Sequence, residues 1–246
     1  MSPANEESRR IRRMFDRIGR RYDLLNHLLS GCSDILWRRS ALRALNASED
    51  DVLLDVGIGT GDLALEALKG KRKPALIIGV DSALGMMRIG RKKAHGPAGR
   101  MGHMDPSGRT IRFVGGSAES LPLRSGVFDG VMVAFGVRNF TDRAAGLRCM
   151  WRVLKPGGRL VVLELSRPRY PVIRQLYRLY AVHVIPWIGG VISGDADAYR
   201  YLQVSVEAFP DRERFRSLME GAGFVDTGWR DLSLGVATVY WGDKRS

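Results

Sequence analysis

The 246-residue sequence contains only two cysteines and four histidines, and this scarcity excludes disulfide-rich and zinc-built proteins. Cys32 and Cys149 have no second thiol or histidine cluster nearby, so we expect two free thiols and no metal site. Long apolar runs are also missing. No stretch reaches the roughly 20 apolar residues that a membrane-spanning helix needs, and the N-terminus lacks the apolar region of a signal peptide. We therefore expect a cytoplasmic protein.

Acidic residues are few compared with basic ones: 26 Asp and Glu stand against 39 Lys and Arg, which gives a formal net charge of +13. Such a charge attracts anionic partners, which include nucleic acids, anionic lipids and phosphorylated substrates. Charge alone does not choose among them, and arginines scattered over surface helices for solubility explain it equally well. The hydrophobic fraction of 45% is enough for a sizeable core, so a folded domain is expected.

Short apolar runs alternate along the chain with segments of helical periodicity. The chain is expected to begin with a helix at 6–29 that has arginines on its outer faces, followed by a second helix at 34–45. Strands are expected at 52–56, 75–80, 111–114, 128–135 and 159–165. This order predicts a mostly parallel sheet covered on both faces. An apolar, aromatic segment at 170–187 breaks the alternation, and 224–229 with 236–241 look like a final antiparallel strand pair.

The most informative segment is Asp-Val-Gly-Ile-Gly-Thr-Gly-Asp at 55–62, directly after the first expected strand. Its glycines, Gly57, Gly59 and Gly61, let the backbone turn tightly and approach a ligand closely. Their G-x-G-x-G spacing is tighter than the G-x-G-x-x-G of a dinucleotide fingerprint, whose helix N-terminus receives a pyrophosphate. The tighter spacing suits a ligand without phosphate, such as S-adenosylmethionine, and Asp55 beside the loop would repel a pyrophosphate.

An acidic residue, Asp81, ends the second expected strand, 20 residues after Gly61. A carboxylate at that place can accept hydrogen bonds from both hydroxyls of a ribose. The glycine loop and this carboxylate together favour a nucleoside site more strongly than the loop alone. A tight strand–helix turn with a helix-capping Asp, or an NAD site, remains the alternative.

Several longer segments resemble the menaquinone/ubiquinone biosynthesis C-methyltransferase family, and the resemblance runs from about residue 14 to residue 241. The glycine loop and the Leu-Lys-Pro-Gly-Gly turn at 154–158 are common to many methyltransferases. Other segments are more specific to the family: Arg-Tyr-Asp-Leu-Leu-Asn at 21–26, Ala-Phe-Gly-Val-Arg-Asn-Phe at 134–140, Ile-Ser-Gly-Asp at 192–195 and Tyr-Arg-Tyr-Leu at 199–202.

The resemblance implies an α/β fold of the Rossmann-like class I methyltransferase type. It would have a seven-stranded, mostly parallel sheet with helices on both faces, N-terminal helices and a helical insertion after the fifth strand. We expect a single domain over residues 1–246. Its parts are an N-terminal helical cap at 1–46, a cofactor-binding core at 47–169, a substrate-side helical insertion at 170–205, and a C-terminal helix and strand pair at 206–246.

The resemblance also implies S-adenosylmethionine as cofactor and contacts to it at Thr60, at Asp81 and at Ser117 with Ala118. The family usually has Asp or Asn where this chain has Ser117, so a direct hydrogen bond to the adenine is replaced by a longer or water-mediated one. Such a loss is worth about 0.5–1.5 kcal/mol, so we expect weaker cofactor affinity. The implied substrate is a prenylated hydroquinone, first of all demethylmenaquinol in menaquinone biosynthesis. A ubiquinone precursor (2-polyprenyl-6-methoxy-1,4-benzoquinol), both quinols, or another small phenol or sterol are the alternatives.

Methyl transfer to an aromatic carbon needs a carbon nucleophile, which a hydroquinone supplies once a ring hydroxyl is deprotonated. Because a phenol has a pKa near 10, the site must favour the phenolate. We expect Arg138 to stabilise it, Asn139 to orient it, and Tyr22 to contact it from the N-terminal helix. The alternatives are a structural ion pair for Arg138, for example with Asp142, and simple packing for Tyr22. His183 is a further candidate as a proton relay, although a structural histidine is more typical of an apolar segment.

A prenylated quinol resides in the bilayer, so the enzyme must reach it from the aqueous side. The basic N-terminal helix and the 170–187 segment could form an apolar tunnel and a rim that contacts the inner membrane surface, or they could simply cap the sheet. An RNA methyltransferase is a rival interpretation, but the sequence lacks an aromatic stacking face or an added RNA-binding module, so no nucleic-acid partner is expected. A non-catalytic module of the same fold is the other rival, and the intact glycine loop argues against it. The oligomeric state is not addressed by the sequence.

Overall fold

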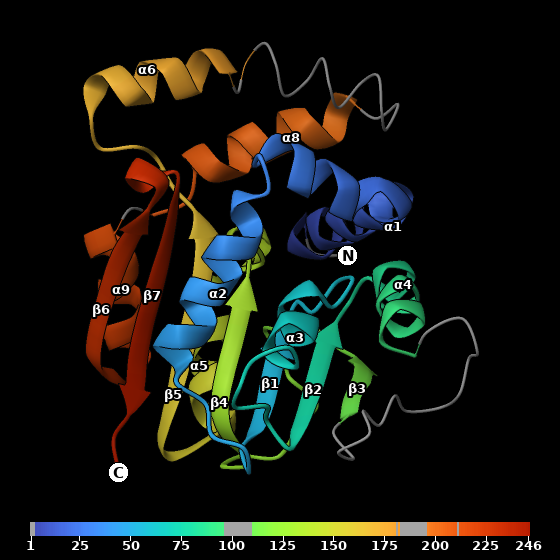
Figure 1. Ribbon diagram of the computed structural model, residues 1–246, viewed down its shortest axis with the longest axis vertical. Helices are drawn as coiled ribbons and strands as arrows, with labels where there is room; N and C mark the ends of the chain where they lie inside the picture. The colour runs from blue at the N-terminus through green and yellow to red at the C-terminus, as the bar shows by residue number, and fades with distance from the viewer. Residues whose placement is uncertain (1–2, 96–109, 181, 183–195, 211) are drawn as a thin grey trace.

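The computed structural model describes residues 3–95, 110–180, 182, 196–210 and 212–246. Seven strands form one sheet in the order β3-β2-β1-β4-β5-β7-β6 (Figure 1). All neighbours are parallel except β7, which is antiparallel to both β5 and β6. The bounds are β1 (Val52–Val56), β2 (Leu76–Asp81), β3 (Thr110–Gly115), β4 (Phe128–Ala134), β5 (Leu154–Leu165), β6 (Phe224–Leu232) and β7 (Ala237–Lys244). The predicted mostly parallel α/β sheet and its final antiparallel pair are therefore confirmed.

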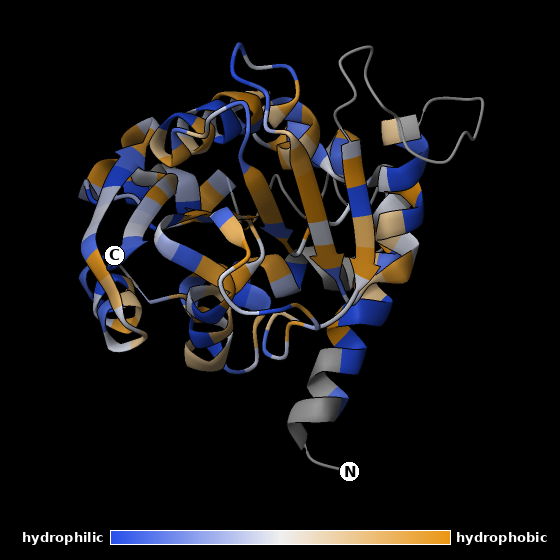
Figure 2. Ribbon diagram, turned by 90° about the horizontal axis from the view of Figure 1, so that it is seen from below, coloured by the Kyte–Doolittle hydropathy of each residue, from blue (hydrophilic) through white to orange (hydrophobic). Residues whose placement is uncertain are grey.

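Each face of the sheet has its own hydrophobic core, because successive side chains of a strand point to opposite faces. Leu54 and Val162 face a core that also contains residues of α5 (Arg143–Val153) and α9 (Arg212–Gly221). Leu53 and Val161 face a second core. The helices that contribute to this second core are α2 (Ser33–Leu45), α3 (Asp62–Ala67) and α4 (Leu84–His95). Figure 2 shows the hydrophobic colour concentrated in the central strands, with mixed colours along the helices.

Three further helices lie beyond the carboxyl ends of the parallel strands (Figure 1). They are α1 (Pro3–Leu29), α6 (Pro171–Leu179) and α8 (Ala196–Glu207). A small cluster centred on Met14 of α1 joins them, with Tyr180 after α6 and Tyr201 and Leu202 of α8. These helices therefore form a roof over the edge at which ligands of open α/β sheets bind.

The N-terminal segment contributes to both parts of the molecule. Helix α1 belongs to the roof, whereas Trp37, Ala41 and Leu45 of α2 pack into the core on the sheet. The division of the chain into cap, core and insertion stays a prediction. The 192–195 segment and His183 lie outside the described residues. Among the helices that the structure describes, none is both long enough and apolar enough to span a membrane.

Candidate active site

The glycine loop after β1 turns tightly around the end of β2. Gly57, Gly59 and Gly61 all have positive φ, at 71°, 52° and 83°, and only glycine adopts this region without strain. The N–H groups of Gly57 and Ile58 donate to the carbonyl of Val80 over 2.7 and 3.2 Å. The side chain of Ile58 is buried below the loop. The loop therefore presents backbone rather than side chains to the space above it.

Asp81 connects this loop with the end of β2. One carboxylate oxygen accepts the N–H of Gly59 at 2.8 Å, and the other accepts the N–H of Ala83 at 2.7 Å. Burial raises the pKa of Asp81, and these backbone hydrogen bonds offset part of the increase. Since each carboxylate oxygen has two lone pairs, both oxygens can still accept a hydroxyl hydrogen bond.

A cleft of about 660 Å³ opens above the loop at the carboxyl ends of the strands. Its walls are the loop, the residues that follow β2, β3 and β4, and the inner face of α1. Most residues predicted for the site line this cleft: Gly57, Gly59, Thr60, Asp81, Ser117, Ala118, Asn139 and Tyr22. Gly61, at the start of α3, and Arg138 do not line it. The residue types expected at a cofactor and substrate site are thus brought together from across the chain.

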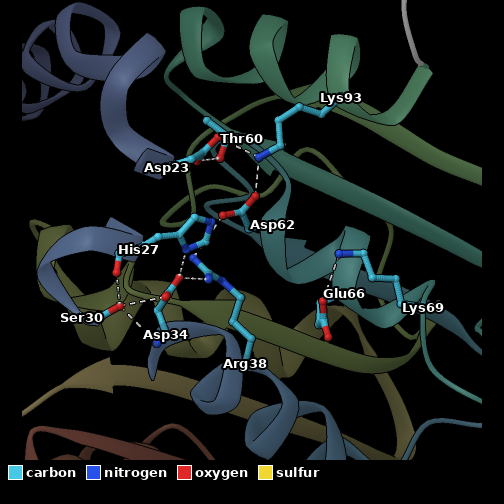
Figure 3. Close-up of polar contacts among 10 residues, drawn as sticks. All are labelled: Asp23, His27, Ser30, Asp34, Arg38, Thr60, Asp62, Glu66, Lys69 and Lys93. Atoms are coloured by element: carbon cyan, nitrogen blue, oxygen red, sulfur yellow. Dashed lines mark hydrogen bonds and ion pairs between the residues drawn. The ribbon is translucent and has the colours of Figure 1, made fainter. Parts of the chain in front are cut away.

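A network of charged side chains holds α1 over the glycine loop (Figure 3). The hydroxyl of Thr60 donates to Asp23 of α1 over 2.5 Å, and Lys93 of α4 donates to the other oxygen of Asp23 at 2.8 Å. Lys93 also pairs with Asp62, the first residue of α3. Near the middle of α1, Asp16 accepts the N–H of Gly85 at 2.9 Å. The Thr60 hydroxyl therefore binds the roof helix, while the rest of this residue faces the cleft.

The same network continues into α2. Arg38 is buried and contacts Asp62 at 3.3 Å, and it pairs with Asp34 one helical turn earlier (Figure 3). His27 and Ser30 bind the same Asp34, each over 2.8 Å. Burial alone would raise the pKa of Asp34, but the Ser30 hydrogen bond and the Arg38 charge lower it below its ordinary value. Four helices, α1 to α4, thus meet around the loop through ionised groups.

Asp55 lies at the floor of the cleft and is 2% exposed. Its Oδ2 is buried and has no hydrogen-bond partner. Burial, and then the nearby negative charge of Asp81, raise the pKa of Asp55 well above its ordinary value. A cationic ligand would relieve both effects. This orphaned oxygen and the backbone-lined loop fit a ligand that is both a nucleoside and a cation, which S-adenosylmethionine is.

The turn after β4 carries the second set of predicted residues. Phe135 has a φ of 57°, a strained value for an aromatic residue, and its N–H donates to the carbonyl of Leu163 at 2.8 Å. Arg138 donates through Nη1 to Glu164 of β5 at 2.7 Å, and its backbone N–H donates to the other oxygen of Glu164 at 3.1 Å. Glu164 is fully buried, so one carboxylate holds both the backbone and the side chain of the turn.

Arg138 lies one layer behind the cleft wall. Burial lowers its pKa, but the charge and hydrogen bond of Glu164 together with the charges of Tyr22 and Tyr201 outweigh this, so the pKa of Arg138 is above its ordinary value. Its Nε is buried without a partner. The side chain is close enough to Tyr22 of α1 and Tyr201 of α8 for their charges to interact. The partner of Arg138 is thus Glu164, whereas Asp142, the alternative considered above, caps α5 through the N–H of Ala145 at 2.9 Å.

Asn139 is held in the cleft wall by the roof. Its Oδ1 accepts a hydrogen bond from the hydroxyl of Tyr201 at 3.0 Å. Tyr22, which also lines the cleft, packs edge-to-face against Phe15 with 5.9 Å between the ring centroids. The turn after β4 and the aromatic residues of α1 and α8 therefore form one surface.

Sequence reasoning did not assign a site role to Asp23, Asp55, Glu164 or Tyr201. The sequence indicates Asp55 only as a residue that repels pyrophosphate, and Tyr201 only as part of a family segment. Glu164 stands inside an apolar run, and a carboxylate in a buried strand is the signal that could have identified it. Within the described residues, no group of three or more His, Cys, Asp or Glu side chains could hold a metal ion.

Comparison with known proteins gives consistent matches over nearly the whole chain. The model of the ubiE/COQ5 methyltransferase family matches residues 3–244. A ubiquinone/menaquinone biosynthesis C-methyltransferase UbiE of Geobacter sulfurreducens is 44% identical over 97% of this chain and 90% of its own length. Demethylmenaquinone methyltransferases of Thermus thermophilus and Porphyromonas gingivalis are each 43% identical, over 94% and 98% of this chain and 100% and 94% of their own lengths.

Solved structures of low sequence identity share the fold. A possible histamine N-methyltransferase of Thermotoga maritima, described as S-adenosylmethionine-dependent, superposes with a TM-score of 0.64 at 21% identity, covering 95% of this chain and 99% of that one. The [4+2]-cyclase SpnF has the same TM-score at 16% identity, covering 97% and 96%. At these identities the likeness shows the class I methyltransferase fold and no particular chemistry.

We expect Glu164→Gln to destabilise the protein by about 3–5 kcal/mol, because it leaves the charge of Arg138 buried without its partner. Urea denaturation of the purified variant measures this loss. Asp142→Asn is the matched control, since Asn caps helices as well as Asp does, and it should leave the unfolding midpoint unchanged. Equal midpoints for both variants would contradict the assigned pairing.

Proposed function

This chain belongs to the ubiE/COQ5 methyltransferase family, and we propose that it methylates a ring carbon of demethylmenaquinol, using S-adenosylmethionine, in menaquinone biosynthesis. The activity rests on the family, since its relatives carry the names of quinone C-methyltransferases. One observation supports the residue roles most directly: a single cleft contains both the glycine loop with the unpartnered Asp55 oxygen and the turn with Asn139. A ubiquinone precursor is the second candidate substrate, because the UbiE relative is named for both quinones.

The cofactor would lie over the glycine loop. We propose that the backbone of Gly57 and Gly59 approaches it, that Asp81 accepts hydrogen bonds from its ribose, and that Ser117 and Ala118 border its adenine. Asp55 would receive its ammonium group, because this oxygen has no partner in the protein. When bound, S-adenosylmethionine supplies an electrophilic methyl group on a sulfonium.

The quinol ring would lie beside Asn139 and Tyr22, which face the cleft. Asn139, fixed by the Tyr201 hydroxyl, donates through Nδ2 to the ring oxygen and so orients the ring. Arg138 would act from behind the wall as a buried positive charge that favours the phenolate. Its Nε–H has no hydrogen-bond partner in the protein. The phenolate increases electron density at the neighbouring ring carbon, which is the atom that gains the methyl group and then loses its proton.

We further propose that the protein is cytoplasmic and contacts the cytoplasmic membrane through α6. This helix exposes apolar Val172 and Leu179, at 69% and 52%, with Arg174 and Arg178 exposed between them. Apolar side chains interleaved with arginines suit the surface of an anionic bilayer. Helix α6 is also the outermost element of the roof in Figure 1.

The activity is tested by incubating the purified enzyme with labelled S-adenosylmethionine and demethylmenaquinol, and we expect a product with one added ring methyl group. Arg138→Met combined with Glu164→Gln removes the buried charge without leaving a carboxylate unpaired. It should lower kcat about 10²–10³-fold and shift the pH–rate profile upward, because the phenol then needs a higher pH to ionise. Arg138→Lys alone keeps a positive charge beside Glu164, so this variant should retain part of the rate and part of the wild-type pH–rate profile. Turnover within a few-fold of wild type in the double variant would remove Arg138 from the mechanism.

Cofactor affinity should depend on the charge of Asp55. The pKa of Asp55 is raised in the free enzyme, and a bound cation favours its ionised form. At pH values below the raised pKa, binding should therefore release a proton, and affinity should increase as pH rises through this range. Calorimetry in two buffers of different ionisation enthalpy measures the released proton. Asp55→Asn should bind more weakly by about 1.5–3 kcal/mol and lose the proton release. Unchanged proton release in that variant would place the ammonium elsewhere.

Membrane contact predicts more sedimentation with vesicles that contain anionic lipid than with neutral ones, and a decrease with added salt. Arg174→Gln with Arg178→Gln should reduce the anionic preference by removing two charges from α6. A double change of two exposed arginines away from α6, Arg148→Gln on α5 with Arg214→Gln on α9, serves as the control for net charge. Equal sedimentation with both vesicle types would contradict this proposal without affecting the proposed activity.

A further inference from the structure

A second hollow of about 780 Å³ lies between α6 and α8, separate from the cofactor cleft. Its size is typical of a site for a small organic ligand. Apolar side chains from both helices form its walls, among them Pro171 and Leu179 of α6 and Leu202 and Val206 of α8. Polar and charged side chains also line it: Arg167, Arg174, Gln175, Arg178, Gln203 and Glu207. The apolar part of the walls suits a hydrocarbon, and we call this hollow the α6–α8 groove.

The inner end of the groove reaches the turn after β4. Tyr177 lines the groove. Burial raises the pKa of Tyr177, while the charge of Arg138 opposes the increase, so the two side chains lie near each other. On α8, Tyr201 binds Asn139 of the cleft wall, and the next residue, Leu202, lines the groove. The groove therefore approaches the turn that carries Arg138 and Asn139.

We propose that the α6–α8 groove binds the isoprenoid tail of the quinol, while the ring occupies the cleft. This inference rests on the proposed function, since it assigns the second part of the same substrate. A hydrocarbon tail gains free energy when apolar walls remove it from water, and Leu179, Leu202 and Val206 supply such walls. The tail would leave the ring beside Tyr177 and Leu202 and run outward toward Leu179, where α6 exposes apolar surface.

Leu179→Glu tests the groove because Leu179 lines it and is 52% exposed, so a charge there does not disturb the core. The matched control is Val172→Glu on the same helix, since Val172 is 69% exposed and does not line the groove. Each variant is assayed, without lipid or detergent, on the tail-free quinol 1,4-dihydroxynaphthalene and on demethylmenaquinols with one to three isoprene units.

We expect Leu179→Glu to raise KM for the longest-tailed quinol about tenfold or more, and progressively less for shorter tails. KM for the tail-free quinol and for S-adenosylmethionine should stay within about twofold of wild type, and Val172→Glu should change none of these values. A charge within an apolar site produces this pattern because its cost grows with the hydrocarbon that it displaces.

The outcomes separate this inference from the proposed function. If the wild-type enzyme methylates none of the quinols, the proposed function fails. If the wild type is active but Leu179→Glu affects tailed and tail-free quinols equally, or affects neither, the groove proposal is overturned. No effect is also the result expected of a groove that serves only a lipid acyl chain, because the assay contains no lipid.

Discussion

The buried ion pair between Arg138 and Glu164 is the constraint on which the rest of the site depends. Glu164 has no exposed surface, and it binds both the backbone N–H and the guanidinium of Arg138. Such a pair is costly to desolvate and is kept only where its geometry is well satisfied. Here it connects the end of β5 with the turn after β4, so that Asn139 faces the cleft and Arg138 lies near the tyrosines of the roof.

A second set of charges positions the roof itself. Asp23 connects α1 with Thr60 in the glycine loop and with Lys93 in α4, and Asp62 extends the network through Arg38 into α2. Any movement of α1 away from the loop must break the contacts of Asp23. The helix that carries Tyr22 into the cleft is therefore tied to the glycine loop. The proposed ring site and the proposed cofactor site thus share one wall, which favours the close alignment that methyl transfer requires.

The sheet and the glycine loop do not by themselves determine the reaction. Proteins described as a possible N-methyltransferase and as a [4+2]-cyclase superpose on this chain equally well, which agrees with the rule that function resides in the site and not in the fold. In this chain, the proposed substrate site is built by the turn after β4 and the three roof helices above it. These elements hold the buried cation, the tyrosines and the α6–α8 groove, and they suit a substrate with a polar ring and an apolar tail.

The positions of the strands along the chain, the glycine loop and Asp81 could be read from the sequence, because apolar periodicity and glycine spacing are local patterns and dictate local backbone. The turn at 134–140 was found the same way, by its motif. Local patterns do not say which side chains meet, so the sequence left Asp142 as a possible partner of Arg138, whereas the fold brings Glu164 from the adjacent strand β5. The sequence also gives no sign that Thr60 and Asp23, which are far apart in the chain, form a hydrogen bond. Nor does it show that α1 belongs to the roof whereas α2 packs into the core on the sheet. Only tertiary packing decides such contacts, because they depend on distances between segments that no single segment encodes.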